Sequence, residues 1–131
     1  SLLFLASLML FAVSCGSGEE HAAETPSPSE SPVLGYLNGL PALIDLGSSS
    51  CVPCQMMEDE LERLDSETGD LLDVQVIDVN RNGQAARDFG IRVIPTQVFL
   101  SESGEELFRH EGYMSFDDMM ARWRTLGYTF E

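Results

Sequence analysis

The pattern of apolar and polar positions divides the chain into two N-terminal stretches and a body. Residues 1–14 carry no charge and are mostly Leu, Phe, Ala, Met and Val. Residues 16–32 contain no large apolar side chain and are rich in Ser, Pro, Gly and Glu. Because such a segment cannot offset the entropy of ordering the chain, we expect a disordered tether. In residues 33–131 short apolar runs alternate with amphipathic segments, which predicts one folded domain.

Short runs of residues between turn signals predict strands within the body, and the run at 74–79 is also rich in β-branched residues. The predicted strands are residues 42–46, 74–79, 96–100 and 105–110. Residues 101–104, Ser-Glu-Ser-Gly, read as a turn. We therefore expect the last two strands to be antiparallel neighbours.

Helical segments are predicted between these strands and at both ends of the body. They are residues 31–39, ending at Gly39; 51–65, with Ser50 as candidate N-cap; 83–89, closed by Gly90; and 115–126, capped by Ser115 with Asp118 in the reciprocal position. In the second helix, apolar residues recur every three or four positions from Cys54 to Leu64, which predicts a core-facing stripe. The acidic residues 58–60 and 62 of that helix are expected to face water. The alternation of helices and strands indicates an α/β sandwich with a mixed sheet.

Charge and cysteine content narrow the possible functions. The 131 residues include 22 acidic residues against seven arginines and no lysine, a formal net charge of −15. Because so acidic a body repels phosphate backbones, nucleic-acid binding is not expected. Three cysteines are too few for a disulfide scaffold or for a four-thiolate zinc site.

The sequence Cys51-Val52-Pro53-Cys54 carries the strongest chemical signal. At a helix start, free N–H groups and the positive end of the helix dipole are expected to stabilise the Cys51 thiolate. Cys54 falls one turn further on, on the predicted buried stripe. We therefore expect Cys51 to attack a substrate disulfide and Cys54 to displace the product.

Two other interpretations of the cysteine pair remain open at this point. One is half of a zinc site, which would need two further ligands, with His21 and His110 as the only histidines. The other is a purely structural disulfide, which would close a very short loop and so remove little entropy from the unfolded chain.

Three segments around these cysteines resemble the thioredoxin family. They are LIDLGSSSCVPCQMM at 43–57, DVNRNGQAARDFGIRVIPTQVFL at 78–100, and Gly112 after the last hairpin strand. The resemblance covers nearly all of residues 40–126. It implies a thioredoxin-like three-layer sandwich, in which helices flank both sides of a mixed central β-sheet.

The resemblance also implies a role for individual residues. Cys51 matches the family nucleophile, Cys54 the resolving cysteine, and Asp45 the buried acid that relays a proton to or from Cys54. A strand-end acid facing water is the alternative for Asp45. Ile94-Pro95-Thr96 matches the cis-proline loop. The residues expected to bind substrate are Val52, Pro53, Ile94, Pro95 and Gly112.

Several positions depart from the family pattern. Ser50 stands where thioredoxins usually have Trp, Val52-Pro53 replaces Gly-Pro, and Val76 aligns with a strand lysine that often partners the buried acid. The family's first strand has no evident counterpart. Val-Pro between the cysteines resembles the TlpA-like group, which comprises membrane-tethered proteins of cytochrome c maturation.

The N-terminal stretch predicts a lipid anchor. Residues 1–14 are too short for a membrane span but fit the apolar core of a secretion signal. Since no Met or basic residue precedes them, we expect the sequence to begin within that signal. Ser14-Cys15-Gly16 resembles a bacterial lipobox, in which Cys15 would be lipidated, although Ala12 stands where Leu is more common. An ordinary signal with an incidental Cys is the alternative. The expected location is extracytoplasmic, in a bacterial periplasm or at the cell surface.

Together these features predict a membrane-tethered reductase of protein disulfides. We expect a monomer that needs no metal and no cofactor beyond the Cys51–Cys54 disulfide. Apocytochrome c is a candidate substrate, and a membrane electron donor of the CcdA or DsbD type is the implied partner. The alternatives are a disulfide oxidase or isomerase on the same fold, and a non-enzymatic copper metallochaperone or adaptor.

Overall fold

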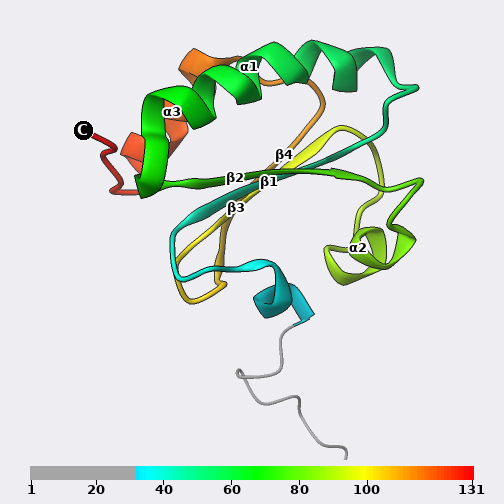
Figure 1. The fold of residues 1–131 in the computed structure, drawn as a ribbon, viewed down its shortest axis with the longest axis horizontal. Helices are drawn as coiled ribbons and strands as arrows, with labels where there is room; N and C mark the ends of the chain where they lie inside the picture. Colours follow the sequence, from blue (N-terminus) through cyan, green and yellow to red (C-terminus); the bar gives the residue numbers. More distant parts are fainter. Residues whose placement is uncertain (1–31) are drawn as a thin grey trace, which may run out of the picture.

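The computed structural model describes residues 32–131 (Figure 1). The predicted signal and lipobox segment 1–15, with Cys15, lies outside the described residues, as does His21 and all but the last residue of the predicted tether 16–32. Within the described part of the chain, no helix is both long and apolar enough to cross a membrane.

The described residues form a mixed four-stranded sheet with helices on both faces. In chain order the elements are η2 (Pro32–Tyr36), β1 (Ala42–Gly47), α1 (Val52–Thr68), η3 (Gly69–Leu71), β2 (Asp73–Asp78), α2 (Gly83–Asp88), β3 (Thr96–Leu100), β4 (Glu106–Glu111) and α3 (Phe116–Thr125). The strand order is β2-β1-β3-β4. The β1–β2 pair is parallel, whereas β1–β3 and β3–β4 are antiparallel. The predicted mixed sheet and the antiparallel final pair are therefore confirmed.

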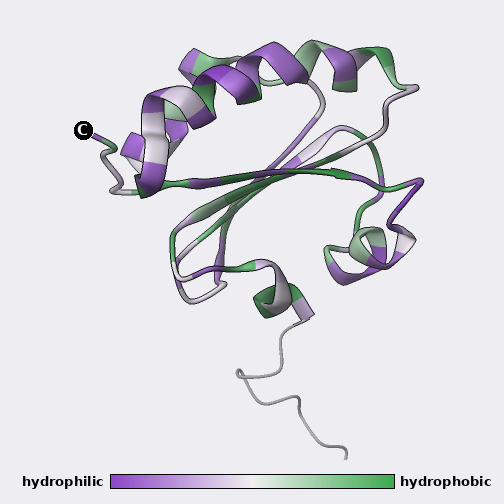
Figure 2. Ribbon diagram, viewed as in Figure 1, coloured by the Kyte–Doolittle hydropathy of each residue, from purple (hydrophilic) through white to green (hydrophobic). Residues whose placement is uncertain are grey.

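Helices α1 and α3 cover one face of the sheet, and η2 and α2 cover the other (Figure 1). Strand β1 is buried along its whole length because it lies in the interior of this sandwich. Its side chains alternate between two cores: Leu43 packs under α1 and α3, while Ile44 and Leu46 pack toward α2 and η2. Figure 2 shows hydrophobic residues along the inner strands, and both hydrophobic and hydrophilic residues on the helices around them. The predicted three-layer α/β sandwich is confirmed.

The core beneath α1 and α3 depends on the apolar stripes that the sequence predicted. Met57, Leu61 and Leu64 are buried on α1. From α3, the fully buried Trp123 packs on Phe99 of β3, with 4.9 Å between ring centroids. These contacts join both helices to the sheet and fix the position of the α1 N-terminus.

The N-cap of α1 is Cys51 and not Ser50, so that prediction was wrong. The Ser50 hydroxyl is paired with the Ser48 hydroxyl at 2.9 Å instead of capping the helix. Cys51 has extended backbone angles, and Pro53 lies within the first turn, where its missing N–H costs nothing. At the other end, α1 continues past the predicted Asp65 to Thr68.

Glu60 was predicted to face water, and it is partly exposed, but its carboxylate also makes contacts that the sequence did not predict. Its carboxylate accepts hydrogen bonds from the Tyr113 hydroxyl at 2.7 Å and from the Phe116 backbone N–H at 2.8 Å. These two bonds lower the pKa of Glu60 below its usual value. Because the partners lie more than 50 positions away in the chain, helical periodicity could not reveal them.

The remaining helix predictions hold with small changes. The first segment forms only a 3-10 turn over Pro32–Tyr36 and not a helix to residue 39. Beyond it, Asn38 Oδ1 accepts the Leu40 N–H at 3.1 Å, and Gly39 takes φ +91°, so the chain turns into β1. Ser115 caps α3 as predicted, accepting the Asp118 N–H at 3.2 Å.

A pair of leucine truncations tests this packing. Leu64 of α1 is fully buried, whereas Leu71 of η3 is 47% exposed. We expect Leu64→Ala to lower the free energy of unfolding by about 2–5 kcal/mol, because it leaves a cavity. Leu71→Ala should change it by less than about 0.5 kcal/mol. Urea unfolding of both variants measures the difference, and equal losses would contradict the described core.

Candidate active site

Cys51 and Cys54 form a disulfide across the first turn of α1, with 5.2 Å between their Cα atoms. The helix starts just after the carboxyl end of β1, so the central strand positions the pair. Cys51 is partly exposed, whereas Cys54 is only 6% exposed. This is the arrangement of one accessible and one shielded sulfur that the sequence predicted.

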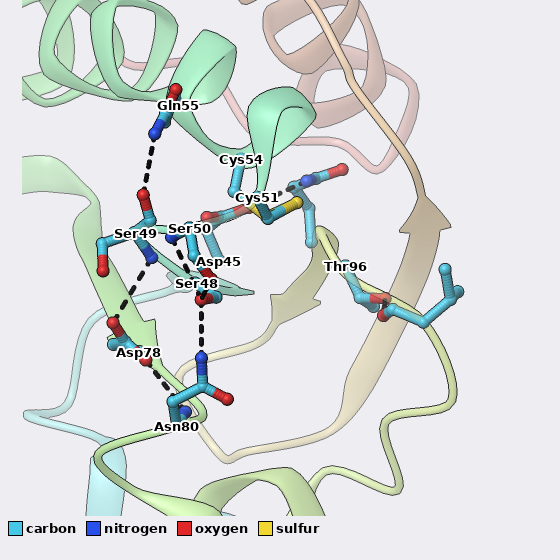
Figure 3. Close-up of a disulfide and its surroundings, with 12 residues drawn as sticks. Asp45, Ser48, Ser49, Ser50, Cys51, Cys54, Gln55, Asp78, Asn80 and Thr96 are labelled. Atoms are coloured by element: carbon cyan, nitrogen blue, oxygen red, sulfur yellow. Dashed lines mark hydrogen bonds between the residues drawn. A yellow bond between two sulfur atoms is a disulfide. The ribbon is translucent and has the colours of Figure 1, made fainter.

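A polar network holds the loop between β1 and Cys51 (Figure 3). The Asn80 side chain donates to the Ser48 hydroxyl at 2.7 Å, and the Ser49 N–H donates to the Asp78 carboxylate at 3.4 Å. The Gln55 amide donates to the Ser49 carbonyl at 2.7 Å. These bonds tie the loop to the end of β2 and to α1, and so hold the backbone that leads to Cys51.

Asp78 and Asn80 were not predicted as part of the site. The signal that could have found them is their position, directly at and after the end of the strand that pairs in parallel with β1. Because parallel strands end at the same edge of a sheet, polar residues there lie beside the loop after β1.

Asp45 is buried behind the disulfide and is 1% exposed, so the alternative of an acid facing water is wrong. It lies on the face of β1 that α1 covers, in alternation with Ile44 and Leu46. Burial raises the pKa of the Asp45 carboxyl to about 6 from its usual 3.8. The Gln97 amide donates to Asp45 Oδ1 at 2.8 Å and opposes this rise in part. Asp45 can therefore exchange a proton near neutral pH.

A cavity of about 180 Å³ opens beside Asp45 and Cys54. Such a volume is large enough for several water molecules. Gly47 lines it, and a Cβ at that position would lie 3.1 Å from Cys54 Sγ. Glycine thus lets the chain pass close to the sulfur. The acidic Glu58 and Asp78 also line the cavity, and its lining includes no cation.

The position opposite Asp45 on β2 is Val76, as the alignment with the family predicted. Val76 is 61% exposed and lines the same cavity. Since a lysine there could pair with the buried acid, its replacement by valine leaves Asp45 without a cationic neighbour across this strand pair.

The residues of the predicted substrate groove gather at the same end of the sheet as the disulfide. The Ile94–Pro95 peptide bond is cis, as the resemblance implied. Pro95 precedes β3, whose Thr96 pairs with Leu46 at the end of β1. The Gly112 N–H donates to the Pro95 carbonyl at 2.8 Å, which joins the two groove segments. Their proposed contact with substrate stays a prediction.

Val52 and Pro53 are both exposed beside the disulfide, and Val52 is 66% exposed.

No metal site is evident among the described residues. Within residues 32–131 the structure shows no group of three or more His, Cys, Asp or Glu side chains placed to hold a metal ion. The His110 Nε2 atom lies 3.0 Å from the Tyr113 carbonyl oxygen. Met57, one of two adjacent methionines in α1, is buried in the core.

Comparisons with known proteins agree with this geometry. A family model described as a thioredoxin-like domain matches residues 36–126. The chain is similar to thioredoxin from Bacillus subtilis strain 168, at 40% identity over 60 residues, which are 46% of this chain and 58% of that protein. It is also similar to thioredoxin from Mycolicibacterium smegmatis, at 37% identity over 82 residues, which are 61% of this chain and 71% of the relative.

Solved structures share the fold at lower sequence identity. Chloroplastic thioredoxin z superposes with a TM-score of 0.64 at 23% identity, covering 72% of this chain and 84% of its own. Thioredoxin-2 of the malaria parasite superposes with a TM-score of 0.63 at 22% identity, covering 66% and 82%. With the family model matching most of the chain and this fold around the cysteine pair, the chain belongs to the thioredoxin-like family.

Proposed function

We propose that this protein is a thiol–disulfide oxidoreductase that reduces disulfides in protein substrates, outside the cytoplasm and tethered to a membrane. The observation that carries the proposal is the Cys51–Cys54 disulfide at the start of α1, with the shielded sulfur next to a cavity that reaches the buried Asp45.

Cys51 is the nucleophile in this mechanism. As the N-cap of α1, it occupies the position where side chains accept hydrogen bonds from first-turn N–H groups. Pro53 has no N–H, so the Cys54 N–H is the donor at the third helical position. Once the disulfide is reduced, a thiolate at Cys51 gains from this N–H and from the helix dipole.

The reaction moves two electrons from the dithiol to the substrate. Cys51 thiolate attacks one substrate sulfur, a mixed disulfide forms, and the other substrate sulfur leaves as a thiolate. Asp45 then takes the Cys54 proton, and the Cys54 thiolate attacks Cys51 Sγ. The bond between Cys51 and the substrate breaks, the Cys51–Cys54 disulfide forms, and the second substrate thiolate leaves. The Asp45 proton passes through the cavity to solvent, where both substrate thiolates are protonated.

The surface around Cys51 suits an extended polypeptide substrate. Val52, Val93 and Tyr113 are large apolar or aromatic residues with 66%, 44% and 39% of their surface exposed. They belong respectively to the Cys-X-X-Cys turn, the cis-proline loop and the segment after Gly112. Because these segments meet at one end of the sheet, their apolar side chains offer a surface for substrate side chains on either side of a disulfide.

The charge around the disulfide favours a reductase over an oxidase. A strong oxidant needs a very stable thiolate, which nearby cations provide. Here Glu58 and Asp78 line the cavity beside Cys54, with no cation in that lining. Negative neighbours disfavour the thiolate and so make the dithiol a better electron donor.

The proposed setting follows from the N-terminal sequence. Lipidation at Cys15 would anchor the domain through the segment 16–32. Because extracytoplasmic compartments are oxidising, a reductase there needs a supply of electrons, for which a membrane conduit of the CcdA or DsbD type is the proposed donor. Apocytochrome c is a candidate among the substrates.

Replacement of each cysteine tests the mechanism. We expect Cys51→Ser to abolish insulin reduction with dithiothreitol as the electron source, because the attacking sulfur is lost. Cys54→Ser should instead accumulate mixed disulfides with substrate, visible on non-reducing gels. All variants are assayed as unlipidated protein. The matched control is Cys15→Ser, which should retain full activity. Wild-type turnover in the Cys51→Ser variant would contradict the mechanism.

Replacement of the buried acid gives opposite effects on rate and stability. Asp45→Asn should slow mixed-disulfide resolution about 10²-fold at pH 7, because the proton acceptor is gone. Folding raises the pKa of Asp45 from 3.8 to about 6, so its ionisation costs stability as pH rises through this window. The free energy of unfolding of the variant should therefore exceed that of wild type by up to about 3 kcal/mol at pH 7. At pH 3, where Asp45 is protonated in both the folded and the unfolded protein, the two values should be equal.

Urea unfolding of the oxidised proteins at both pH values measures the stability change, and stopped-flow kinetics measure the rate. An unchanged resolution rate would remove the proton-relay role of Asp45. An unchanged stability at pH 7 would show that the carboxyl is not desolvated in the folded protein.

The direction of electron flow is tested by the reduction potential of the Cys51–Cys54 pair. The protein is equilibrated with dithiol buffers, and free thiols are trapped and counted. We expect a reduction potential of about −270 mV, as in thioredoxin. A potential of about −120 mV would overturn the reductase assignment and favour an oxidase.

A further inference from the structure

Gln97 of β3 is a polar side chain buried at the centre of the sheet, with 0% of its surface exposed. It stands directly opposite Asp45 in the antiparallel β1–β3 register. Its neighbours Val98 and Leu100 belong to the core on the far side of the sheet. By strand alternation, Gln97 and Asp45 therefore share the face that α1 covers.

The Gln97 side chain donates a hydrogen bond to Asp45. Its Nε2 atom lies 2.8 Å from Asp45 Oδ1, and within residues 32–131 no other group donates a hydrogen bond to that carboxyl. An amide N–H stabilises the ionised form of a carboxyl group and disfavours the protonated form. Val76 occupies the position on β2 where the family often has a lysine, so no cation faces Asp45 from that strand. The bond from Gln97 is therefore the interaction that stabilises a charged Asp45.

The other half of the Gln97 amide is left unsatisfied. Its Oε1 atom is buried and has no hydrogen-bond partner among the described residues. A buried acceptor without a partner costs stability, so packing alone would favour an apolar residue such as leucine or methionine here. The glutamine is thus explained by what its donor does for Asp45, and not by its contribution to the fold.

We propose that Gln97 is a positioning residue that holds the Asp45 carboxyl in its ionised form beside Cys54, and so sets the pH at which Asp45 releases its proton. The use of that proton in catalysis rests on the proposed function. The hydrogen bond and its effect on Asp45 do not depend on it.

Other titratable groups surround this pair and have to be separated from it. Glu58 of α1 and Asp78 of β2 line the cavity that Asp45 reaches, together with Cys54. His110 of β4 stands opposite Gln97 in the β3–β4 register. Histidine side chains commonly change charge between pH 5 and 8, so His110 needs its own control.

The test is a carboxyl titration of Asp45 by carbon NMR in the full oxidised chain, where both active-site cysteines are held in the disulfide. Gln97→Met keeps the length and volume of the side chain but removes the donor. We expect its Asp45 midpoint to lie about one pH unit above that of wild type. Gln97→Leu also lacks the donor and should raise the Asp45 midpoint in the same way. This second variant replaces Gln97→Met in the test if that protein does not fold.

Two control variants separate this effect from looser packing and from His110. Val98→Ala disturbs the same strand on its opposite face and should leave the Asp45 midpoint unchanged. The Gln97→Met shift should persist when His110 is also replaced by Asn. Equal midpoints in wild type and both Gln97 variants would overturn the proposal. So would a shift that disappears with His110→Asn.

A second readout keeps this inference distinct from the proposed function. Cys51 in the reduced protein is capped with thionitrobenzoate, and its release by Cys54 is followed against pH. If Asp45 relays the proton, the release profile shifts upward with Gln97→Met. A shifted carboxyl midpoint with an unshifted release profile would support the Gln97 contact and overturn the relay role of Asp45.

Discussion

The Asp45 carboxyl occupies a strand whose two faces are both covered, and the chemistry of the site depends on the cost of placing a charge there. All six residues of β1 are buried, and Asp45 is the acidic one among them. Desolvation in this position raises the pKa of the carboxyl toward neutrality. Ionisation of this carboxyl therefore costs stability at pH 7, yet the fold keeps it buried next to a shielded sulfur.

The remaining architecture serves to hold that carboxyl and the disulfide together. Helix α1 begins where β1 ends, so its first turn presents Cys51 to solvent and turns Cys54 toward the sheet. The α1 side chains Met57, Leu61 and Leu64 lie in the same core as Trp123 and Phe99. Glu60 also joins α1 to Tyr113 and to the Phe116 N–H. Packing far from the cysteines therefore determines their exposure and their geometry.

Hydrogen bonds of polar groups hold the loop before the disulfide, at a place where the thioredoxin pattern has a tryptophan. With Ser50 in place of Trp, the loop before Cys51 is held by hydrogen bonds from Asn80 to Ser48 and from Ser49 to Asp78. The cavity beside Cys54 is acidic, and its edge at Val76 lacks the family's lysine. The fold is thioredoxin-like, and the cavity beside the disulfide is lined by acidic side chains without a cation.

The sequence by itself determined the local elements and the chemistry of the cysteine pair. Short apolar runs predicted β1 and β3, and helical periodicity predicted the apolar stripe of α1, because these patterns reflect which parts of an element are buried. The Cys-Val-Pro-Cys spacing pointed to the disulfide, and the resemblance to thioredoxin predicted Asp45, Pro95 and Gly112 as residues of the site. Tertiary structure alone decided the rest. The contacts of Glu60, the Asn80 clamp on the loop and the Gln97–Asp45 bond each join residues at least 32 positions apart. No local pattern encodes such pairs, because they exist only once the strands are in register and the helices are packed on them.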